Sequence, residues 1–189
     1  MLVAEEYAPR RTRGGGLRPT ASRVILALFS LLGERVQGAR VLDLFAGTGS
    51  LGVEALRRGA SSADFVEIDR RLVQALRQRL ASHHLQEVAN VFCMRAEQAL
   101  NRLKGPYDLV LLDPPYDYPS LNTFLDALVT SPLVSTNALV VVEHSKHHPL
   151  PQNIGAFGLW KQRRYGDTMI TIYARRGNPD GESPIPWDL

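Results

Sequence analysis

The chain has 189 residues, of which 44% are hydrophobic, and it carries a formal net charge of +3. Its length fits one domain with a full hydrophobic core, and its single cysteine, Cys93, excludes an intrachain disulfide and a cluster of thiolate metal ligands. Since no stretch reaches the roughly 20 apolar residues of a membrane-spanning helix, we expect a protein of the reducing cytoplasm, without a membrane or metal partner, with Cys93 in its core.

The chain begins with a basic segment that contains several glycines. Five arginines lie close together with no acid among them, namely Arg10, Arg11, Arg13, Arg18 and Arg23. Clustered arginines are typical of contacts with nucleic-acid phosphates, and the glycines at residues 14–16 make the segment flexible. We therefore predict a flexible basic arm at residues 1–16 and nucleic-acid contacts from these five arginines. A solvated surface without a partner is the alternative. Smaller basic clusters lie at residues 70–71, 161–164 and 175–176.

A helix is predicted over residues 24–32. Its apolar residues share one helical face, formed by Val24, Ile25, Leu28, Phe29 and Leu32. Pro19 and Thr20 precede the run as a usual helix start, and Gly33 ends it. A secretory signal is the alternative, but no cleavage site of the A-x-A type follows the apolar run. We therefore predict a helix that packs on a sheet.

Residues 40–52, RVLDLFAGTGSLG, predict a strand, a tight turn and a helix. The nearly continuous apolar run of Val41, Leu42, Leu44 and Phe45 suits a parallel strand that is buried on both faces. The glycines that follow allow a tight turn and the close approach of a ligand to the backbone, while the first amides of the helix point back at the turn. This combination indicates a nucleotide-binding site.

Two ligands fit this turn. Gly47, Gly49 and Gly52 have the GxGxxG spacing of a dinucleotide site, and Glu67 follows at the expected distance. Asp43 favours a different ligand, because a buried carboxylate is costly unless it is paired or hydrogen-bonded. The ammonium and sulfonium groups of S-adenosylmethionine (SAM) would compensate its charge. Alternatively, Asp43 accepts hydrogen bonds from amides of the loop above it.

Strands and helices alternate through the rest of the chain. We predict strands at residues 63–68, 88–94, 107–112, 138–143, 157–164 and 168–174, and helices at residues 70–83, 97–103 and 123–129. This order predicts an α/β fold with a Rossmann-like, seven-stranded, mostly parallel sheet, helices on both faces and a C-terminal antiparallel hairpin. The domain is expected at residues 17–176, followed by a disordered tail at residues 177–189 that contains three prolines.

Ligands of such sheets bind at the carboxyl ends of the strands. Glu67 ends the second strand, and its two acceptor oxygens suit the hydroxyls of a ribose, while Asp69 is better placed to cap the next helix. Arg95 and Ala96 follow the third strand, and Asp113 ends the fourth. Cofactor contacts are predicted from Asp43, Phe45, Gly47, Gly49, Glu67, Ile68, Arg95 and Ala96.

The fourth strand is followed by Asp113, Pro114, Pro115 and Tyr116. The prolines fix the backbone, so that the Pro114 carbonyl and the Asp113 carboxylate form two rigid acceptors beside the Tyr116 ring. This arrangement suits a planar amine, since the acceptors take its two protons and the ring stacks on the base. The acceptors also stabilise the positive charge that develops on an exocyclic amine during methyl transfer. We therefore predict catalytic roles for Asp113, Pro114 and Tyr116; a proline-stiffened turn without a function is the alternative.

Four stretches of the chain resemble the RsmD-type family of bacterial enzymes that methylate the N2 amine of a guanine in 16S ribosomal RNA, within the SAM-dependent methyltransferase superfamily. They are LRPT at residues 17–20, VLDLFAGTGSLGVEALRRGA at residues 41–60, FVEIDR at residues 65–70 and LVLLDPPY at residues 109–116. The resemblance implies that the glycine turn and Asp43 hold the methionine part of SAM, that Glu67 holds the ribose, and that Ala96 and its neighbours hold the adenine. It assigns the guanine to Asp113, Pro114 and Tyr116.

The chain departs from the family pattern at several positions. Family members usually carry an acid, an arginine and a glutamate after LRPT, and these positions are occupied here by Ser22, Ile25 and Leu26. Arg95 stands where an acid is expected after the third strand. The basic strand that begins other family members is replaced by the arginine and glycine arm.

Three kinds of function remain open. The first is a SAM-dependent guanine-N2 methyltransferase that acts as a monomer on 16S ribosomal RNA or the small ribosomal subunit; an ionised Asp113 suits the neighbouring N1–H and N2–H donors of guanine. The second transfers the methyl group to adenine N6 or to a protein glutamine. The third is a nicotinamide-dependent oxidoreductase, for which the histidines are poorly placed, since His144, His147 and His148 are predicted in a surface loop. A nonenzymatic RNA-binding module would follow if Arg95 prevented cofactor binding.

Overall fold

The computed structural model describes residues 19–177. The predicted arm at residues 1–16 with Arg10, Arg11 and Arg13, the neighbouring Arg18, and residues 178–189 of the predicted tail lie outside the described residues. Arg23, the remaining arginine of the predicted cluster, is exposed on the first helix. Within residues 19–177, none of the helices combines the length and the apolar character that crossing a membrane requires.

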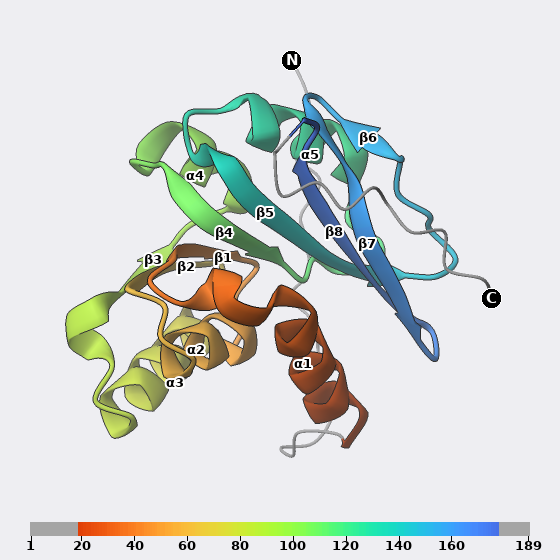
Figure 1. Ribbon diagram of the computed structural model, residues 1–189. Helices are drawn as coiled ribbons and strands as arrows, with labels where there is room; N and C mark the ends of the chain where they lie inside the picture. The colour runs from red at the N-terminus through yellow and green to blue at the C-terminus, as the bar shows by residue number, and fades with distance from the viewer. Residues whose placement is uncertain (1–18, 178–189) are drawn as a thin grey trace.

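Within the described residues, a single sheet of eight strands forms the centre of the fold, in the order β3-β2-β1-β4-β5-β8-β7-β6 (Figure 1). The strands are β1 (Arg40–Leu44), β2 (Ser62–Glu67), β3 (Ala89–Cys93), β4 (Tyr107–Leu112), β5 (Val134–Ser145), β6 (Asn153–Ile154), β7 (Phe157–Tyr165) and β8 (Thr168–Arg175). Strands β1 to β5 pair in parallel, and β8, β7 and β6 add antiparallel pairs.

The predicted fold class is confirmed, with one strand more than the seven expected. The additional strand, β6, has two residues that pair with Gly158 and Phe157 of β7. Two residues are too few to show the alternation of apolar and polar side chains by which a strand is recognised in a sequence. The pairing exists because the chain returns to the edge of β7, which the sequence does not indicate.

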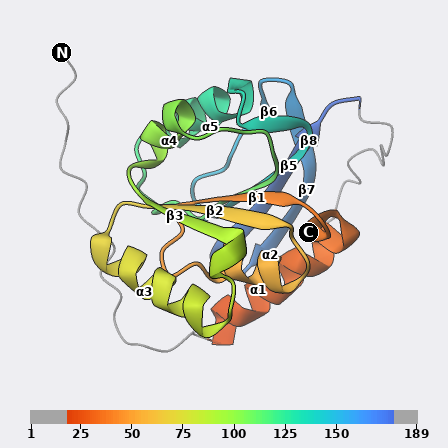
Figure 2. The same ribbon diagram turned by 90° about the vertical axis from the view of Figure 1, so that its left-hand side faces the viewer.

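Helices cover both faces of the sheet (Figure 2). One layer contains α1 (Pro19–Leu32), α2 (Ser50–Arg57) and α3 (Arg70–Ser82), and the other contains α4 (Ala96–Arg102) and α5 (Leu121–Thr130). Two 3-10 helices, at Gly33–Val36 and Gln86–Val88, complete the connections. Val41 packs in the hydrophobic cluster under the first layer and Leu42 and Leu44 pack in the cluster under the second. The apolar run of β1 is therefore unbroken because both of its faces are covered.

Two local expectations were wrong. Cys93 is exposed rather than in the core, because β3 is the outermost strand of the parallel half of the sheet and only part of its surface is covered. His144 lies buried within β5 rather than in a surface loop, because β5 continues to Ser145 alongside β8. The His144 Nδ1 donates to the carbonyl oxygens of Ser145 and His148 at 3.0 Å, and its Nε2 accepts from the Thr171 hydroxyl at 2.8 Å.

A buried polar cluster joins the amino-terminal ends of the central strands. The Tyr107 hydroxyl donates to the Asp64 carboxylate at 2.5 Å, and the Asn90 amide donates to its other oxygen at 2.8 Å. The Arg40 guanidinium lies over the Tyr107 ring, 4.4 Å from its centroid, and 3.6 Å from the Asp64 carboxylate. These contacts connect β1, β2, β3 and β4 at the edge of the sheet where the parallel strands begin.

Tyr107→Phe should lower the free energy of unfolding by about 1–3 kcal/mol, because it removes a donor from a buried carboxylate. The measurement is urea unfolding at neutral pH. The matched control is Tyr116→Phe, whose hydroxyl bonds in an exposed position, and whose effect should stay below about 0.5 kcal/mol. Equal losses in the two variants would contradict a stabilising role for the Tyr107 hydroxyl.

Candidate active site at the carboxyl ends of the strands

A cavity of about 250 Å³ lies where β1, β2 and β4 end. Among the residues predicted to bind or react, it is lined by Asp43, Phe45, Gly47, Glu67, Ile68, Arg95, Ala96 and Asp113. Gly49, Pro114 and Tyr116 do not line it. The two motifs that the sequence separates by about 65 residues therefore share one cavity, although not every residue of each motif faces it.

The topology of the sheet brings the two motifs together. β1 and β4 are direct parallel neighbours, and Asp43 pairs with Leu111 in their register. Asp113 follows two residues after Leu111, so its side chain leaves the backbone on the same face as Asp43. Sequence spacing predicted that both motifs lie at one edge, and the pairing of β1 with β4 makes them adjacent.

The glycine turn has the backbone geometry that glycine permits most easily. Gly47 has φ of +57° and Gly49 has φ of +78°, both in the left-handed region. A side chain on Gly52 would place its Cβ 2.3 Å from the Phe65 ring and 2.9 Å from the Asp43 carboxylate. Gly52 thus allows α2 to pack directly against the end of β1 and β2. Phe45, although it has a side chain, also has a left-handed φ of +61°.

Asp43 is almost fully buried beneath this turn, with an exposed fraction of 2%. Its Oδ2 accepts a hydrogen bond from the Gly52 amide at 2.8 Å, so the donor lies in the first turn of α2 and not in the loop that the structural alternative named. Burial raises the pKa of Asp43 to about 7; the Gly52 hydrogen bond opposes this rise, while the charges of Asp113 and Glu67 add to it. The carboxylate also lines the cavity, so it serves the turn and can still face a ligand.

Glu67 holds the turn from the neighbouring strand. Its Oε2 accepts from the Gly47 amide at 2.8 Å and its Oε1 accepts from the Asp69 amide at 2.8 Å. Asp69 caps α3, as predicted, by accepting from the Arg71 amide at 2.7 Å. Glu67 therefore has a structural role as well as a place in the cavity wall, and ribose binding by Glu67 stays a prediction.

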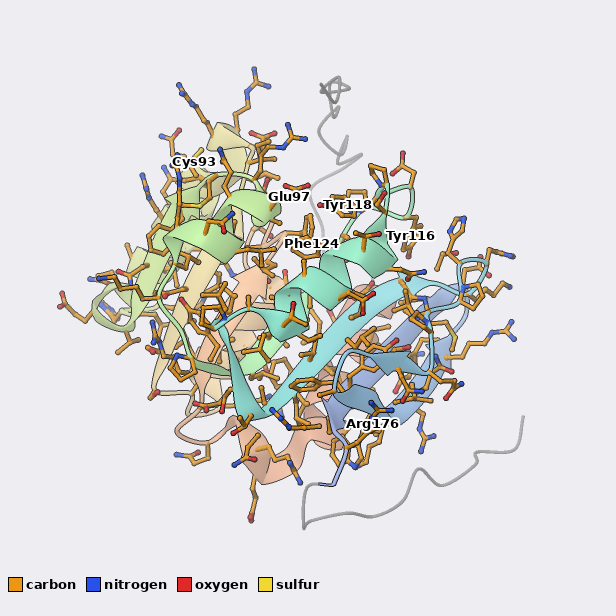
Figure 3. All side chains as sticks on the ribbon, turned by 90° about the horizontal axis from the view of Figure 1, so that it is seen from above. Cys93, Glu97, Tyr116, Tyr118, Phe124 and Arg176 are labelled. Atoms are coloured by element: carbon orange, nitrogen blue, oxygen red, sulfur yellow. The ribbon has the colours of Figure 1, made fainter. Side chains whose placement is uncertain are left out.

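The two ends of the proline corner, residues 113–116, face in different directions. Asp113 lines the cavity, Pro114 is buried, and the Tyr116 side chain is 44% exposed. The Tyr116 hydroxyl lies 3.2 Å from the Thr168 hydroxyl at the start of β8. Figure 3 shows Tyr116 on the outer side of the loop, away from Glu97. The ring predicted to stack on a base thus stands outside the cavity lining, beside the β7–β8 hairpin.

Two of the cavity residues that sequence reasoning missed contact each other across the cavity. Tyr118 and Glu97 line the cavity, and the Tyr118 hydroxyl donates to the Glu97 carboxylate. Each lies two residues beyond a predicted site residue, namely Tyr116 and Arg95. Their position next to the motifs was visible in the sequence, but their contact depends on how helix α4 and the loop before α5 pack.

The chemistry of the cavity suits a ligand that carries positive charge. The carboxyl groups of Asp43, Glu67 and Asp113 all line it. The pKa of Asp43 is raised by its burial and by the charges of Asp113 and Glu67, so its anionic form is disfavoured. A cation bound among them would remove this repulsion. Gly47, whose Cβ would meet no atom within 4 Å, leaves space for a ligand against the backbone. SAM, with its ammonium and sulfonium groups, therefore fits the residues that are present. No group of acidic, histidine or cysteine side chains in residues 19–177 forms a candidate metal site.

Comparison with known proteins gives consistent results. A family model described as conserved hypothetical protein 95 matches residues 10–174. The chain is 33% identical over 167 residues to the putative rRNA methyltransferase YlbH of Bacillus subtilis, which covers 87% of this chain and 91% of the relative. It is 32% identical over 168 residues to the ribosomal RNA small subunit methyltransferase D of Escherichia coli K12, which covers 89% of this chain and 84% of the relative.

A solved structure is similar in fold as well as in sequence. The putative methyltransferase yhhF from Escherichia coli superposes with a TM-score of 0.78 and 32% identity, over 87% of this chain and 91% of that chain. The similarity thus extends over nearly the whole of both chains.

Binding of SAM near pH 7 should release protons. The free site holds Asp43 with a pKa of about 7, and a bound cation lowers this pKa, so affinity should rise as pH increases from about 6 to 8. Calorimetric titration in buffers of different ionisation enthalpy measures the released protons directly. The matched variant Asp43→Asn cannot release a proton at this position. The same proton count in both proteins would show that Asp43 does not face the ligand.

Proposed function

The chain belongs to the family described as conserved hypothetical protein 95, and we propose that it is a SAM-dependent methyltransferase that methylates the N2 amine of a guanine in 16S ribosomal RNA. Support comes from relatives that are 32–33% identical over most of both chains and are named as ribosomal RNA methyltransferases. The observation that carries the proposal is the shared cavity of the glycine turn and the proline corner, because methyl transfer requires a donor and an amine to meet in one place.

The cofactor side of the cavity is formed by the ends of β1, β2 and β3. When bound, SAM supplies an electrophilic methyl group. Asp43 compensates the positive charge of the ligand, the backbone at Gly47 allows its close approach, and Glu67 provides acceptors for the ribose. Ile68, Arg95 and Ala96, which follow the second and third strands, form the adenine end.

The acceptor side is formed by the corner at Asp113. The guanine edge presents N1–H and N2–H together, and the ionised Asp113 and the Pro114 carbonyl accept from these donors. As the methyl group is transferred, positive charge develops on N2, and the same acceptors stabilise it. Tyr116, which is exposed outside the cavity lining, stacks on a base that approaches from the solvent.

The nicotinamide alternative has less support. A dinucleotide fold has the fully parallel strand order 3-2-1-4-5-6, whereas here the antiparallel β8 follows β5 in the sheet. His144, near the carboxyl end of β5, is buried and hydrogen-bonded to Thr171. Adenine N6 and a glutamine amide remain as alternative acceptors, because each offers an amine to the same pair of oxygens.

The RNA partner is assigned to two basic regions. The first is the arm at residues 1–16 with Arg18 and Arg23. The second is the end of the β7–β8 hairpin, which carries Arg163 and the exposed Arg164 and which the Tyr116–Thr168 contact places beside the proline corner. Phosphates beside a guanine in the cavity would pass over the hairpin end, and the protein acts as a monomer in the cytoplasm.

Asp113→Ala should lower the rate of methyl transfer by a factor of about 100 or more, because it removes an acceptor from the developing charge. SAM affinity, measured by calorimetry, should change little. The assay uses labelled SAM with naked 16S ribosomal RNA, small ribosomal subunits and DNA, followed by identification of the modified nucleoside. A large loss of SAM affinity in this variant would show that Asp113 belongs to the cofactor site. If the label is found in adenine or in protein, that group would replace guanine as the proposed acceptor.

Deleting residues 1–15 should weaken RNA binding and flatten its dependence on salt. Each lost phosphate contact should reduce the slope of log K against log salt by about 0.7–0.9. Arg164→Ala should reduce the slope by the amount that corresponds to about one lost contact. Arg102→Ala is the matched control, since this exposed arginine ends α4 at the opposite edge of the sheet. Slopes that match the unaltered chain would assign these basic residues to a solvated surface.

A further inference from the structure

The cavity has two walls that come from separate parts of the chain. One wall is formed by the glycine turn and the first turn of α4, and the other by the loop at residues 113–120 between β4 and α5. Glu97 belongs to the first wall and Tyr118 to the second. Figure 3 shows the two side chains pointing toward one another, and the Tyr118 hydroxyl donates to a Glu97 oxygen. A side-chain hydrogen bond therefore joins the two walls.

The Tyr118 ring is held in place by aromatic packing. It meets Phe45 edge-on, with ring centroids 4.9 Å apart and planes inclined by 74°, and it meets Phe124 in the same manner at 6.0 Å. Phe45 and Phe124 also contact each other at 5.9 Å. Edge-to-face contacts at these distances are favourable beyond the burial of area. The ring thus packs against the end of β1 and against α5, in addition to the contact of its hydroxyl.

A backbone turn gives the two tyrosines of this loop opposite directions. The Tyr118 amide donates to the Pro115 carbonyl at 2.9 Å, which bends the chain between them. Tyr118 consequently lines the cavity, while Tyr116 contacts Thr168 on the outside. The loop that carries Asp113 is therefore connected to the cofactor wall through Tyr118.

Glu97 is well placed to receive this hydrogen bond. It lies in the first turn of α4, where the helix dipole favours a negative charge. Its other oxygen lies 3.8 Å from the Arg95 guanidinium, and both side chains are roughly half exposed, so this ion pair contributes little. A hydrogen bond from a hydroxyl to a carboxylate is stronger than one between neutral groups. Tyr118 is accordingly the more important partner of Glu97.

We propose that the Tyr118–Glu97 hydrogen bond is a latch that closes the cavity over bound SAM and holds the Asp113 loop against the cofactor wall. Tyr118 is a positioning residue, since it acts through the loop that carries Asp113 and through Glu97. The inference rests on the proposed cofactor, but not on the identity of the methylated acceptor. While the latch is closed, SAM and its product S-adenosylhomocysteine leave the cavity slowly; they exchange when the hydroxyl releases Glu97.

The experiment measures cofactor binding and release without RNA. Tyr118→Phe keeps the ring and its packing but removes the donor, and it should raise both the Kd of SAM and its dissociation rate about tenfold. At saturating SAM, kcat should fall less than about threefold. Glu97→Ala should have the same effect on SAM as Tyr118→Phe, whereas Glu97→Gln, which retains an acceptor oxygen, should stay within about twofold of the unaltered chain.

A double-mutant cycle isolates the pair from other effects of each change. The double variant Tyr118→Phe with Glu97→Ala should bind SAM as weakly as either single variant, because both remove the same interaction. Tyr173→Phe is the matched control for loss of a tyrosine hydroxyl, since its hydrogen bond to the Pro151 carbonyl at 2.6 Å lies away from the cavity lining. This variant should leave SAM binding unchanged.

The outcomes separate the latch from the proposed function. If Tyr118→Phe releases SAM as slowly as the unaltered chain, or if the two single effects add in the double variant, the latch is wrong while SAM dependence stands. If the unaltered chain binds no SAM, the proposed function and the latch both fail. If SAM binds and shows the coupled effects but no guanine is methylated, the latch stands and the proposed acceptor is wrong.

Discussion

The hydrogen bond from the Gly52 amide to the buried Asp43 carboxylate joins the first strand to the helix that follows it. It requires a residue without a side chain at position 52, because a Cβ there would collide with both Asp43 and Phe65. It also places a carboxyl group under the turn, where burial disfavours its charge. The close packing of α2 and the burial of the Asp43 carboxyl group under the turn both depend on this contact.

Other acidic side chains also hold the turn and add negative charge to the cavity. Glu67 fixes the turn through the Gly47 amide, and Asp113 arrives from β4 because β4 pairs with β1. Several carboxyl groups around one small space, among them those of Asp43, Glu67 and Asp113, favour a cationic ligand, and an acceptor at residue 113 favours an amine with two donors. A methyl donor with a positive charge and an exocyclic amine satisfy both demands, which a nicotinamide dinucleotide does not.

The two walls of the cavity differ in how they are built. The cofactor wall comes largely from a contiguous motif and from strand ends held by backbone hydrogen bonds. The acceptor wall is a loop, and its contacts with the first wall are made by side chains, chiefly Tyr118 with Glu97 and Phe45. A rigid wall and a side-chain-held loop suit a site that keeps one ligand while it exchanges another.

The sequence by itself determined the features that depend on neighbours in the chain. The apolar run of β1, the left-handed glycines, the Asp69 cap and the rigid corner at Asp113 follow from local stereochemistry and periodicity, and the alternation of elements predicted the parallel sheet with its terminal hairpin. Only the tertiary structure decided which strands lie at an edge, and hence that Cys93 is exposed, that β5 extends far enough to bury His144, and that Tyr118 rather than Tyr116 faces the cavity. These outcomes depend on contacts between segments that are distant in the chain, and no local pattern specifies which surfaces such segments cover.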